Sequence, residues 1–177
     1  MTTSQALGDG TTGTLQPMDG FLTDRRALVT GASGRLGRAI ALALAREGAI
    51  PIVHYRGDEA GAHETVRLLR EEGVDSCALQ ADLAQDDACR DLVDAACERL
   101  GGLDVLVNNA AMFERAPLAD MDVGDFDRHM ASNARSVYAL SLHAGRRMKA
   151  QGSGNVVNLA DVAADRPWPA YVAYSAS

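Results

Sequence analysis

Three glycines, Gly31, Gly34 and Gly37, lie where a short apolar run, 27–29, gives way to apolar residues at helical spacing. This pattern predicts a strand, a glycine-rich turn and a helix. At such a junction Gly31 permits a tight turn, Gly34 lets the backbone approach a ligand, and Gly37 lets the helix pack on the sheet. The free N–H groups of the helix N-terminus favour an anion, so the segment predicts a phosphate-binding loop. The alternative is a glycine-rich connection without a ligand.

The end of the second predicted strand carries the signal for cofactor selection. It reads His54-Tyr55-Arg56, with no acidic residue before Asp58. Strands that select NAD place an acidic side chain here to accept from the ribose 2′-hydroxyl. A basic end can instead pair with a 2′-phosphate, so we expect NADPH to be preferred, with His54 and Arg56 as the phosphate contacts.

A polar residue interrupts the inward face of the last long helix that the spacing predicts. Asn133 shares that face with Phe126, Met130, Val137 and other apolar residues. A buried amide must be satisfied, either by the core or by a functional water network.

Strands and helices alternate along the chain. Strands are predicted over 27–29, 50–55, 74–80, 103–107 and 155–160, with helices between them and a long helix over 122–151. Such alternation requires right-handed crossovers, so the fold class is α/β, a Rossmann-like doubly wound parallel sheet. Residues 1–24 lack hydrophobic periodicity and predict a flexible N-terminal tail before one dinucleotide-binding domain, 25–177.

Composition excludes several classes of protein. The 177 residues are 47% hydrophobic and 23% charged, which is ordinary for a folded soluble domain. No apolar run approaches the ~20 residues that a transmembrane helix needs. The net charge of −7 disfavours binding to nucleic acid. The three scattered cysteines predict neither disulfides nor a metal site, so we expect reduced thiols in a cytoplasmic protein.

Together with Asn108-Asn109-Ala110-Ala111 after the fourth strand and Tyr174 near the end, these features resemble the short-chain dehydrogenase/reductase family over 25–177. The family loop is Thr-Gly-x-x-x-Gly-x-Gly, and Arg35 stands where the middle glycine belongs. That arginine, and Asp161 in place of the family's usual serine, are similar to the pteridine reductase branch. The resemblance implies NADP(H)-dependent reduction of a pterin- or dihydrofolate-like substrate. The alternatives are a 3-oxoacyl or sugar carbonyl reductase of the same family and an inactive nucleotide-binding fragment.

The resemblance implies roles for individual residues and no metal ligand. Catalytic roles fall on Asn133, Asp161 and Tyr174, and substrate contacts on Arg35, Phe113, Asp161 and Tyr174. Cofactor contacts fall on Gly31, Ser33, Arg35, Leu36, Gly37, His54, Tyr55, Arg56, Asp82, Leu83, Asn109 and Ala110.

Several of these residues also have ordinary structural interpretations. These are solvated charges at Arg35 and Arg56, a helix N-cap at Asp82, a turn at Asn108-Asn109, core packing at Phe113 and Asn133, and a loop position in a degraded site at Asp161.

Chemistry favours the pterin interpretation of Asp161, which precedes Tyr174 by thirteen residues. An ionised carboxylate would repel the oxyanion that develops when a carbonyl is reduced. It suits a substrate that offers N–H donors and is reduced across a C=N bond.

The motif that begins at Tyr174 matches the family's Tyr-x-x-x-Lys up to its last letter, so a lysine would follow Ser177. In the family this lysine lowers the pKa of the tyrosine and binds the nicotinamide ribose. We therefore expect a chain truncated at its C-terminus, with the last strands missing and little activity of its own. The full-length enzyme is expected to form homo-oligomers.

Overall fold

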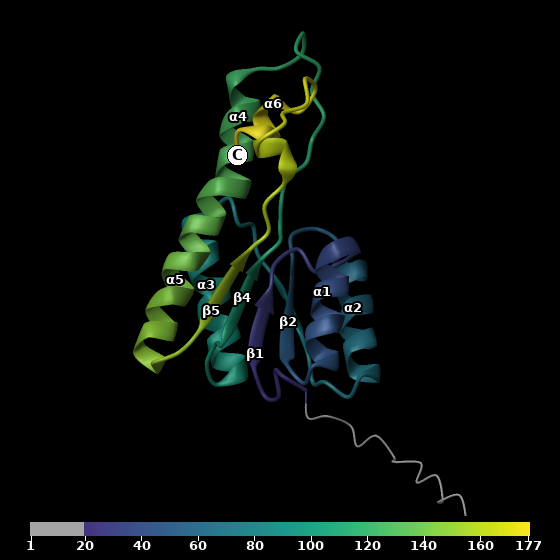
Figure 1. The fold of residues 1–177 in the computed structure, drawn as a ribbon, viewed down its shortest axis with the longest axis vertical. Helices are drawn as coiled ribbons and strands as arrows, with labels where there is room; N and C mark the ends of the chain where they lie inside the picture. Colours follow the sequence, from purple (N-terminus) through teal and green to yellow (C-terminus); the bar gives the residue numbers. More distant parts are fainter. Residues whose placement is uncertain (1–19) are drawn as a thin grey trace, which may run out of the picture.

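The computed structural model describes residues 20–177 and contains one five-stranded parallel sheet (Figure 1). The strand order is β3-β2-β1-β4-β5. The strands are β1 (Arg26–Val29), β2 (Ile50–Tyr55), β3 (Ala78–Gln80), β4 (Val105–Asn108) and β5 (Asn155–Asn158). The chain therefore reverses its direction of travel across the sheet at the β1–β4 pair, which is where ligands bind in such sheets.

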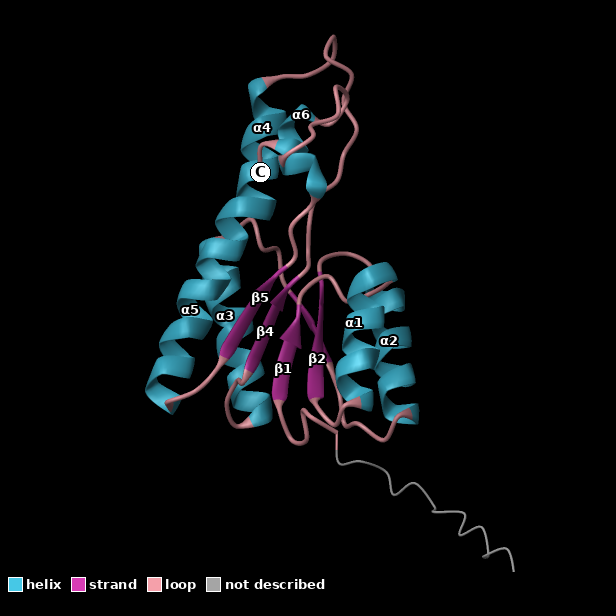
Figure 2. Cartoon of the chain, viewed as in Figure 1, coloured by secondary structure: helices cyan, strands magenta, loops and turns pink. Residues whose placement is uncertain are grey.

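Helices cover both faces of the sheet (Figure 2). The covering helices are α1 (Arg35–Arg46) and α2 (Glu59–Glu71) on one face and α3 (Asp86–Leu100) and α5 (Ser136–Gln151) on the other. Beyond the carboxyl ends of the strands lie α4 (Val123–His129), α6 (Val172–Ser175) and a 3-10 turn, η2, at Val162–Ala164. Side chains alternate along each strand, so Leu28 packs toward α3 and α5 while Val29 packs toward α1 and α2. The predicted α/β doubly wound fold is confirmed.

The chain is ordered before the predicted boundary at residue 24. The Leu22 N–H donates to the Glu47 carbonyl oxygen (2.9 Å), and the Asp24 N–H donates to the Gly48 carbonyl oxygen (3.0 Å). Residues 20–24 thus form a turn against the end of α1, which composition alone does not indicate. The remainder of the predicted tail, 1–19, lies outside the described residues.

The helix predicted over 122–151 contains a wider turn of π type, Met130–Arg135, between α4 and α5. Asp122 begins it with a capping box, because its carboxylate accepts from the Asp125 N–H and that of Asp125 accepts from the Asp122 N–H. The wide turn breaks the 3.6-residue period. Asn133 is therefore buried as predicted, whereas Phe126, predicted on the same face, is 44% exposed.

The strand predicted over 74–80 forms only at 78–80. The Val74 N–H still bonds to the end of α2 at the Leu69 carbonyl oxygen (3.0 Å), and the Ser76 N–H bonds back to Val74 (3.0 Å). These local bonds take the place of ladder bonds, so the strand starts later. No helix within residues 20–177 is long and apolar enough to cross a bilayer.

An ion pair joins the starts of the two central strands. Arg26 donates from Nε (2.7 Å) and Nη2 (2.8 Å) to the two carboxylate oxygens of Asp104, and its backbone N–H donates to the same group (3.0 Å). Gln151, at the end of α5, adds a fourth bond (2.8 Å). These bonds hold the pKa of Asp104 well below its ordinary value.

We expect the substitution Asp104→Asn to lower the free energy of unfolding by about 3 kcal/mol, because it leaves a largely buried guanidinium without its anion. Asp104 is protonated more readily in the unfolded chain, so its contribution is present above about pH 4 and is lost as the pH falls below that value. Urea denaturation at pH 7 and at pH 3.5 measures both effects.

The control is Asp91→Asn, which removes an exposed partner of Arg90 and should change stability by less than about 1 kcal/mol. Equal losses in the two variants, or a loss in Asp104→Asn that persists unchanged at low pH, would contradict this account.

Candidate functional site

Thr30 joins the two strands at the point where the sheet order reverses. Its buried hydroxyl accepts from the N–H groups of Asn109 (2.9 Å) and Ala110 (3.0 Å). The same hydroxyl donates to the Val107 carbonyl oxygen (3.3 Å). The Asn109 amide returns the contact by donating to the Thr30 carbonyl oxygen (2.8 Å). Sequence analysis missed Thr30, although its place at the end of β1 directly before Gly31 is a usable signal.

The phosphate loop, which we define as residues 31–37, packs tightly at two glycines. Gly31 has φ +64°, and a Cβ there would lie 2.9 Å from the Ala110 Cα. A Cβ on Gly37 would collide with the Gly31 carbonyl oxygen. Gly34 has open space around it, so nothing in the protein hinders a ligand at that point. The positive φ of Gly31 fits the tight turn predicted there, whereas Gly37 lets α1 approach the phosphate loop and Asn109 and not, as predicted, the sheet itself.

Arg35 occupies the position of the family's middle glycine and keeps a glycine-like backbone, with φ +48°. A left-handed conformation costs a residue with a side chain roughly 1–2 kcal/mol. Strain of this kind is typical of functional sites, where the side chain contributes something that glycine cannot.

Arg38 braces the phosphate loop from α1. Its guanidinium donates to the carbonyl oxygens of Ser33 (2.6 Å) and Gly61 (3.0 Å) and to the Thr65 hydroxyl (2.9 Å). Thr65, on α2, in turn donates to the Ala32 carbonyl oxygen (2.9 Å). The start of α2 is therefore fixed against the phosphate loop, by contacts between two distant segments that have no signature in sequence spacing.

His54 does not play the predicted part of a phosphate contact. Its ring is 1% exposed, Nδ1 accepts from the Gly31 N–H (3.1 Å), and Nε2 lies 3.1 Å from the Ala81 carbonyl oxygen. These partners assign the ring proton to Nε2. Burial lowers the pKa of His54 to about 4, so the ring is neutral at pH 7 and has no free nitrogen for an anion.

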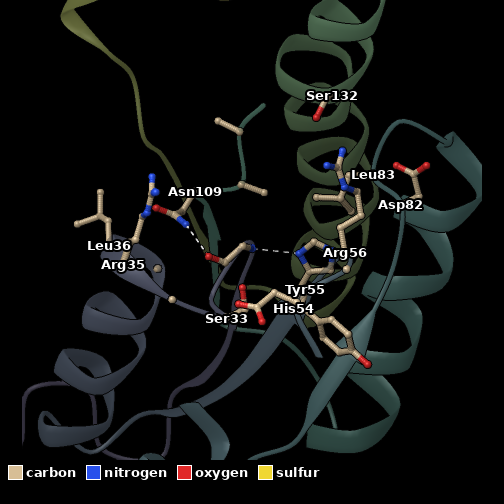
Figure 3. A pocket seen from close by; sticks show the side chains of 17 residues that line it. Ser33, Arg35, Leu36, His54, Tyr55, Arg56, Asp82, Leu83, Asn109 and Ser132 are labelled. Atoms are coloured by element: carbon tan, nitrogen blue, oxygen red, sulfur yellow. Dashed lines mark hydrogen bonds between the residues drawn. The ribbon is translucent and has the colours of Figure 1, made fainter. Parts of the chain in front are cut away.

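A cavity of about 540 Å³ opens above the phosphate loop (Figure 3). All the residues predicted to contact a cofactor border it, which brings together four separate segments of the chain. Arg35 and Arg56 extend from two different loops toward the same side of the sheet (Figure 3). Tyr55 borders the cavity while its ring packs in the core between the sheet and α1 and α2. The open space at Gly34, the side chains of Arg35 and Arg56 and the N-terminus of α1 fit a dinucleotide phosphate.

Two acidic residues also border this cavity, and both are engaged locally. The Asp58 carboxylate caps α2 by accepting from the Gly61 N–H (3.0 Å). The Asp82 carboxylate accepts from the Ala84 N–H (3.2 Å) in the turn that precedes α3, whose N-cap is Gln85. The interpretation of Asp82 as the N-cap itself is wrong.

A second cavity, of about 240 Å³, adjoins the first along Asn109, Ala110 and Ala111. It contains all three residues predicted to be catalytic: Asn133, Asp161 and Tyr174. The Tyr174 hydroxyl donates to Asp161 Oδ2 at 2.8 Å.

The pair of Asp161 and Tyr174 has opposed titration behaviour. The Ala163 N–H and the Tyr174 hydroxyl lower the pKa of Asp161, so this carboxyl is ionised at pH 7. Burial and the Asp161 charge raise the pKa of Tyr174 to about 12, so the phenol keeps its proton. A neutral phenol is the form that can donate a proton to a substrate.

Asn133 is satisfied by neighbouring segments. Its Oδ1 accepts from the Met112 N–H (2.7 Å), and its Nδ2 donates to the Met112 carbonyl oxygen (3.1 Å) and to the Ser177 hydroxyl (2.9 Å). Its side chain thus joins the π turn to the loop after β4 and to the segment that carries Tyr174. Ser177 is a second contact that sequence analysis missed.

Phe113 lies apart from both cavities. Its ring stacks on Tyr171 with centroids 4.5 Å apart and meets the Tyr174 ring edge-on at 4.7 Å. One face of Phe113 is therefore covered by the protein, but the side chain is 49% exposed and does not belong to the core. Its predicted contact with a substrate stays a prediction.

A comparison with known families decides the assignment. The sequence profile described as short chain dehydrogenase matches residues 25–177. The chain belongs to the short-chain dehydrogenase family. The predicted family is thus confirmed, and the pteridine reductase branch stays a prediction.

Curated relatives in the short-chain dehydrogenase family include two named enzymes. 3beta-Hydroxysteroid dehydrogenase 1 of Eggerthella lenta is 34% identical over 157 residues, which cover 88% of this chain and 60% of the relative. 3-Oxoacyl-[acyl-carrier-protein] reductase of Staphylococcus aureus is 38% identical over 138 residues, which cover 78% of this chain and 56% of the relative. The chain thus spans 56% to 60% of the length of these two relatives.

Solved structures of short-chain dehydrogenases share the fold. A short chain dehydrogenase from Burkholderia cenocepacia in complex with NADP has a TM-score of 0.81 at 36% identity, covering 88% of this chain and 63% of that one. An NAD⁺-bound xylitol dehydrogenase has a TM-score of 0.82 at 29% identity, covering 88% of this chain and 60% of that one. Structural relatives thus use either dinucleotide.

The positive φ of Arg35 gives a test of the phosphate loop. We expect Arg35→Gly to raise the free energy of unfolding by up to about 1 kcal/mol, because the relief of backbone strain exceeds the added chain entropy. Leu36→Gly, at the next and ordinary helical position, should lower it by up to about 1 kcal/mol. Urea denaturation of both variants compares them directly. A loss of stability in Arg35→Gly equal to that in Leu36→Gly would show that Arg35 is not strained.

Proposed function

We propose that the whole protein is an oxidoreductase that moves hydride between NADP(H) and a carbonyl or alcohol group of a small molecule. The observation that carries this proposal is the contact between the two cavities. A dinucleotide lying on the phosphate loop would end beside the Tyr174 hydroxyl. The bound nicotinamide supplies the hydride, and the protein supplies position and a proton.

The residues of this chain divide that work. The phosphate loop, including Arg35, would bind the phosphates of the cofactor. Asn109 and Ala110 border both cavities, where one passes into the other. Tyr174 holds a proton at its hydroxyl oxygen, where it can donate to the substrate oxygen that becomes an alcohol. Asn133 positions the Tyr174 segment through Ser177.

The preference for NADPH rests on Arg56, since His54 is neutral and buried. Asp58, the nearest carboxylate along the chain, is engaged with the Gly61 N–H and is directed to its own helix. The end of β2 therefore presents the Arg56 guanidinium, and no unengaged carboxylate, to the ribose 2′-phosphate of a bound NADPH.

We expect Arg56→Ala to weaken NADPH binding by roughly ten- to a hundredfold, the value of one charge-assisted contact, and to leave NADH binding unchanged. Fluorescence titration of the whole protein with each cofactor measures this. Arg90→Ala, which removes an exposed arginine of α3, should change neither. Equal affinity of the unmutated protein for both cofactors would contradict the preference.

Carbonyl or alcohol substrates are favoured by the relatives, whose names refer to 3beta-hydroxysteroids and 3-oxoacyl groups. The neutral Tyr174 phenol holds a proton that can pass to an oxygen as hydride arrives, and its pKa of about 12 would have to be lowered for efficient transfer at pH 7. The names of the relatives support a reducible C=O group as the substrate group beside Tyr174.

Reduction of a pterin- or dihydrofolate-like C=N bond is the second candidate, and one observation favours it. The ionised Asp161 lies in the place beside Tyr174 where an oxyanion would be repelled and an N–H donor would be bound. Arg35, the residue that resembles the pteridine reductases, borders the adjoining cofactor cavity.

Substrate assays of the whole protein with NADPH separate the two candidates. We expect turnover of 3-oxoacyl or steroid ketones, and we expect Asp161→Ser to raise that turnover at least tenfold, because a repulsive charge is replaced by a hydroxyl donor. The control Asp165→Ser alters an exposed residue outside both cavities and should have no effect. Turnover of dihydropterin that Asp161→Ser abolishes would favour the second candidate instead.

Other expectations for the whole protein stay predictions. These are assembly into homo-oligomers, a cytoplasmic location, and weak activity of residues 1–177 on their own.

A further inference from the structure

His54 contacts the phosphate loop at two consecutive residues. Its ring accepts from the Gly31 N–H (3.1 Å), and its backbone carbonyl accepts from the Ala32 N–H (2.9 Å). The other ring nitrogen reaches the Ala81 carbonyl oxygen, directly before Asp82 and Leu83, which border the same cavity. One imidazole thus connects β2 to the loops that follow β1 and β3.

We propose that His54 is a positioning residue of the dinucleotide site, whose neutral ring sets the backbone of Gly31 and fixes the phosphate loop to the turn after β3. This proposal rests on the proposed function, because its ligand is the same dinucleotide. The role differs from direct phosphate contact, because both ring nitrogens are already engaged.

The surroundings of Gly31 explain why its N–H needs a defined acceptor. Gly31 has φ +64°, and its Cα lies so close to Ala110 that a Cβ would be 2.9 Å from the Ala110 Cα. A rotation of the Gly31 peptide to find another acceptor would move the phosphate loop against Ala110, in the loop after β4. The N–H groups of Gly31 and Ala32 already donate to His54, so an anion must be bound by N–H groups further along the phosphate loop. The first turn of α1 carries no side-chain cap and provides such groups.

Two substitutions by amide side chains test the two ring nitrogens of His54 separately. In His54→Asn, Oδ1 takes the place of Nδ1 and can still accept from the Gly31 N–H, but the contact with Ala81 is lost. In His54→Gln, Nε2 takes the place of the ring Nε2 and can still donate to Ala81, but Gly31 loses its acceptor. Each variant removes one hydrogen bond from one buried site, so they form a matched pair.

We expect His54→Gln to weaken NADPH binding at least tenfold and His54→Asn to weaken it by less than threefold, with similar melting temperatures. Titration of the whole protein with NADPH measures the affinity. Equal weakening in both variants, or none in either, would overturn the proposal.

Amide hydrogen exchange at Gly31, measured without cofactor, tests the tether independently of the proposed function. We expect faster exchange in His54→Gln and unchanged exchange in His54→Asn. If the unmutated protein binds no NADPH, the proposed cofactor is wrong. Equal Gly31 exchange rates in the two variants would overturn the proposed role of His54 in holding the Gly31 backbone.

Nitrogen-15 shifts of the His54 ring in the unmutated protein serve if either variant fails to fold. They should report a proton on Nε2 and none on Nδ1 at pH 7. A proton on Nδ1 would overturn the proposal, because Nδ1 could not then accept from Gly31.

Discussion

The β1–β4 pair is the contact on which the rest of the site depends. These strands lie side by side in the sheet although about eighty positions separate them in the chain. The buried Thr30 hydroxyl accepts two backbone N–H groups from the start of the next loop, and Asn109 donates back to β1. Because a parallel pair ends both strands at one edge, the phosphate loop and the Asn109 segment must leave the sheet together. Both cavities form at that edge.

Contacts from separate directions then determine the shape of the phosphate loop. His54 engages its first two N–H groups, Arg38 and Thr65 engage two of its carbonyl oxygens, and Gly37 packs against its start. A loop whose polar groups are already satisfied has little entropy left to lose on binding. The strained backbone of Arg35 is tolerable in this setting, because the surrounding contacts leave it no other conformation.

The sequence was sufficient for features that depend on local pattern. β2 begins and ends at the predicted residues, 50–55. The motif also predicted Asp161 and Tyr174 at one site, which the second cavity brings together, although their hydrogen bond was not predicted. His54 was misjudged because charge was inferred from residue type, whereas burial, which only the fold determines, makes the ring neutral. The π turn was missed because an inserted residue leaves no mark in a 3.6-residue pattern. The stacking of Phe113 on Tyr171 was missed because the two residues are distant in the chain.

The charges of the two cavities differ, and this difference constrains how a dinucleotide can lie across them. The first cavity carries Arg35 and Arg56 together with two carboxylates, Asp58 and Asp82, each of which already accepts from a backbone N–H. The second contains the ionised Asp161 and the neutral Tyr174. Phosphates placed near Asp161 would be repelled at short range, whereas an uncharged ring end would not. The proposed dinucleotide would therefore lie with its phosphates near Arg35 and Arg56 and with its nicotinamide end near the Tyr174 phenol.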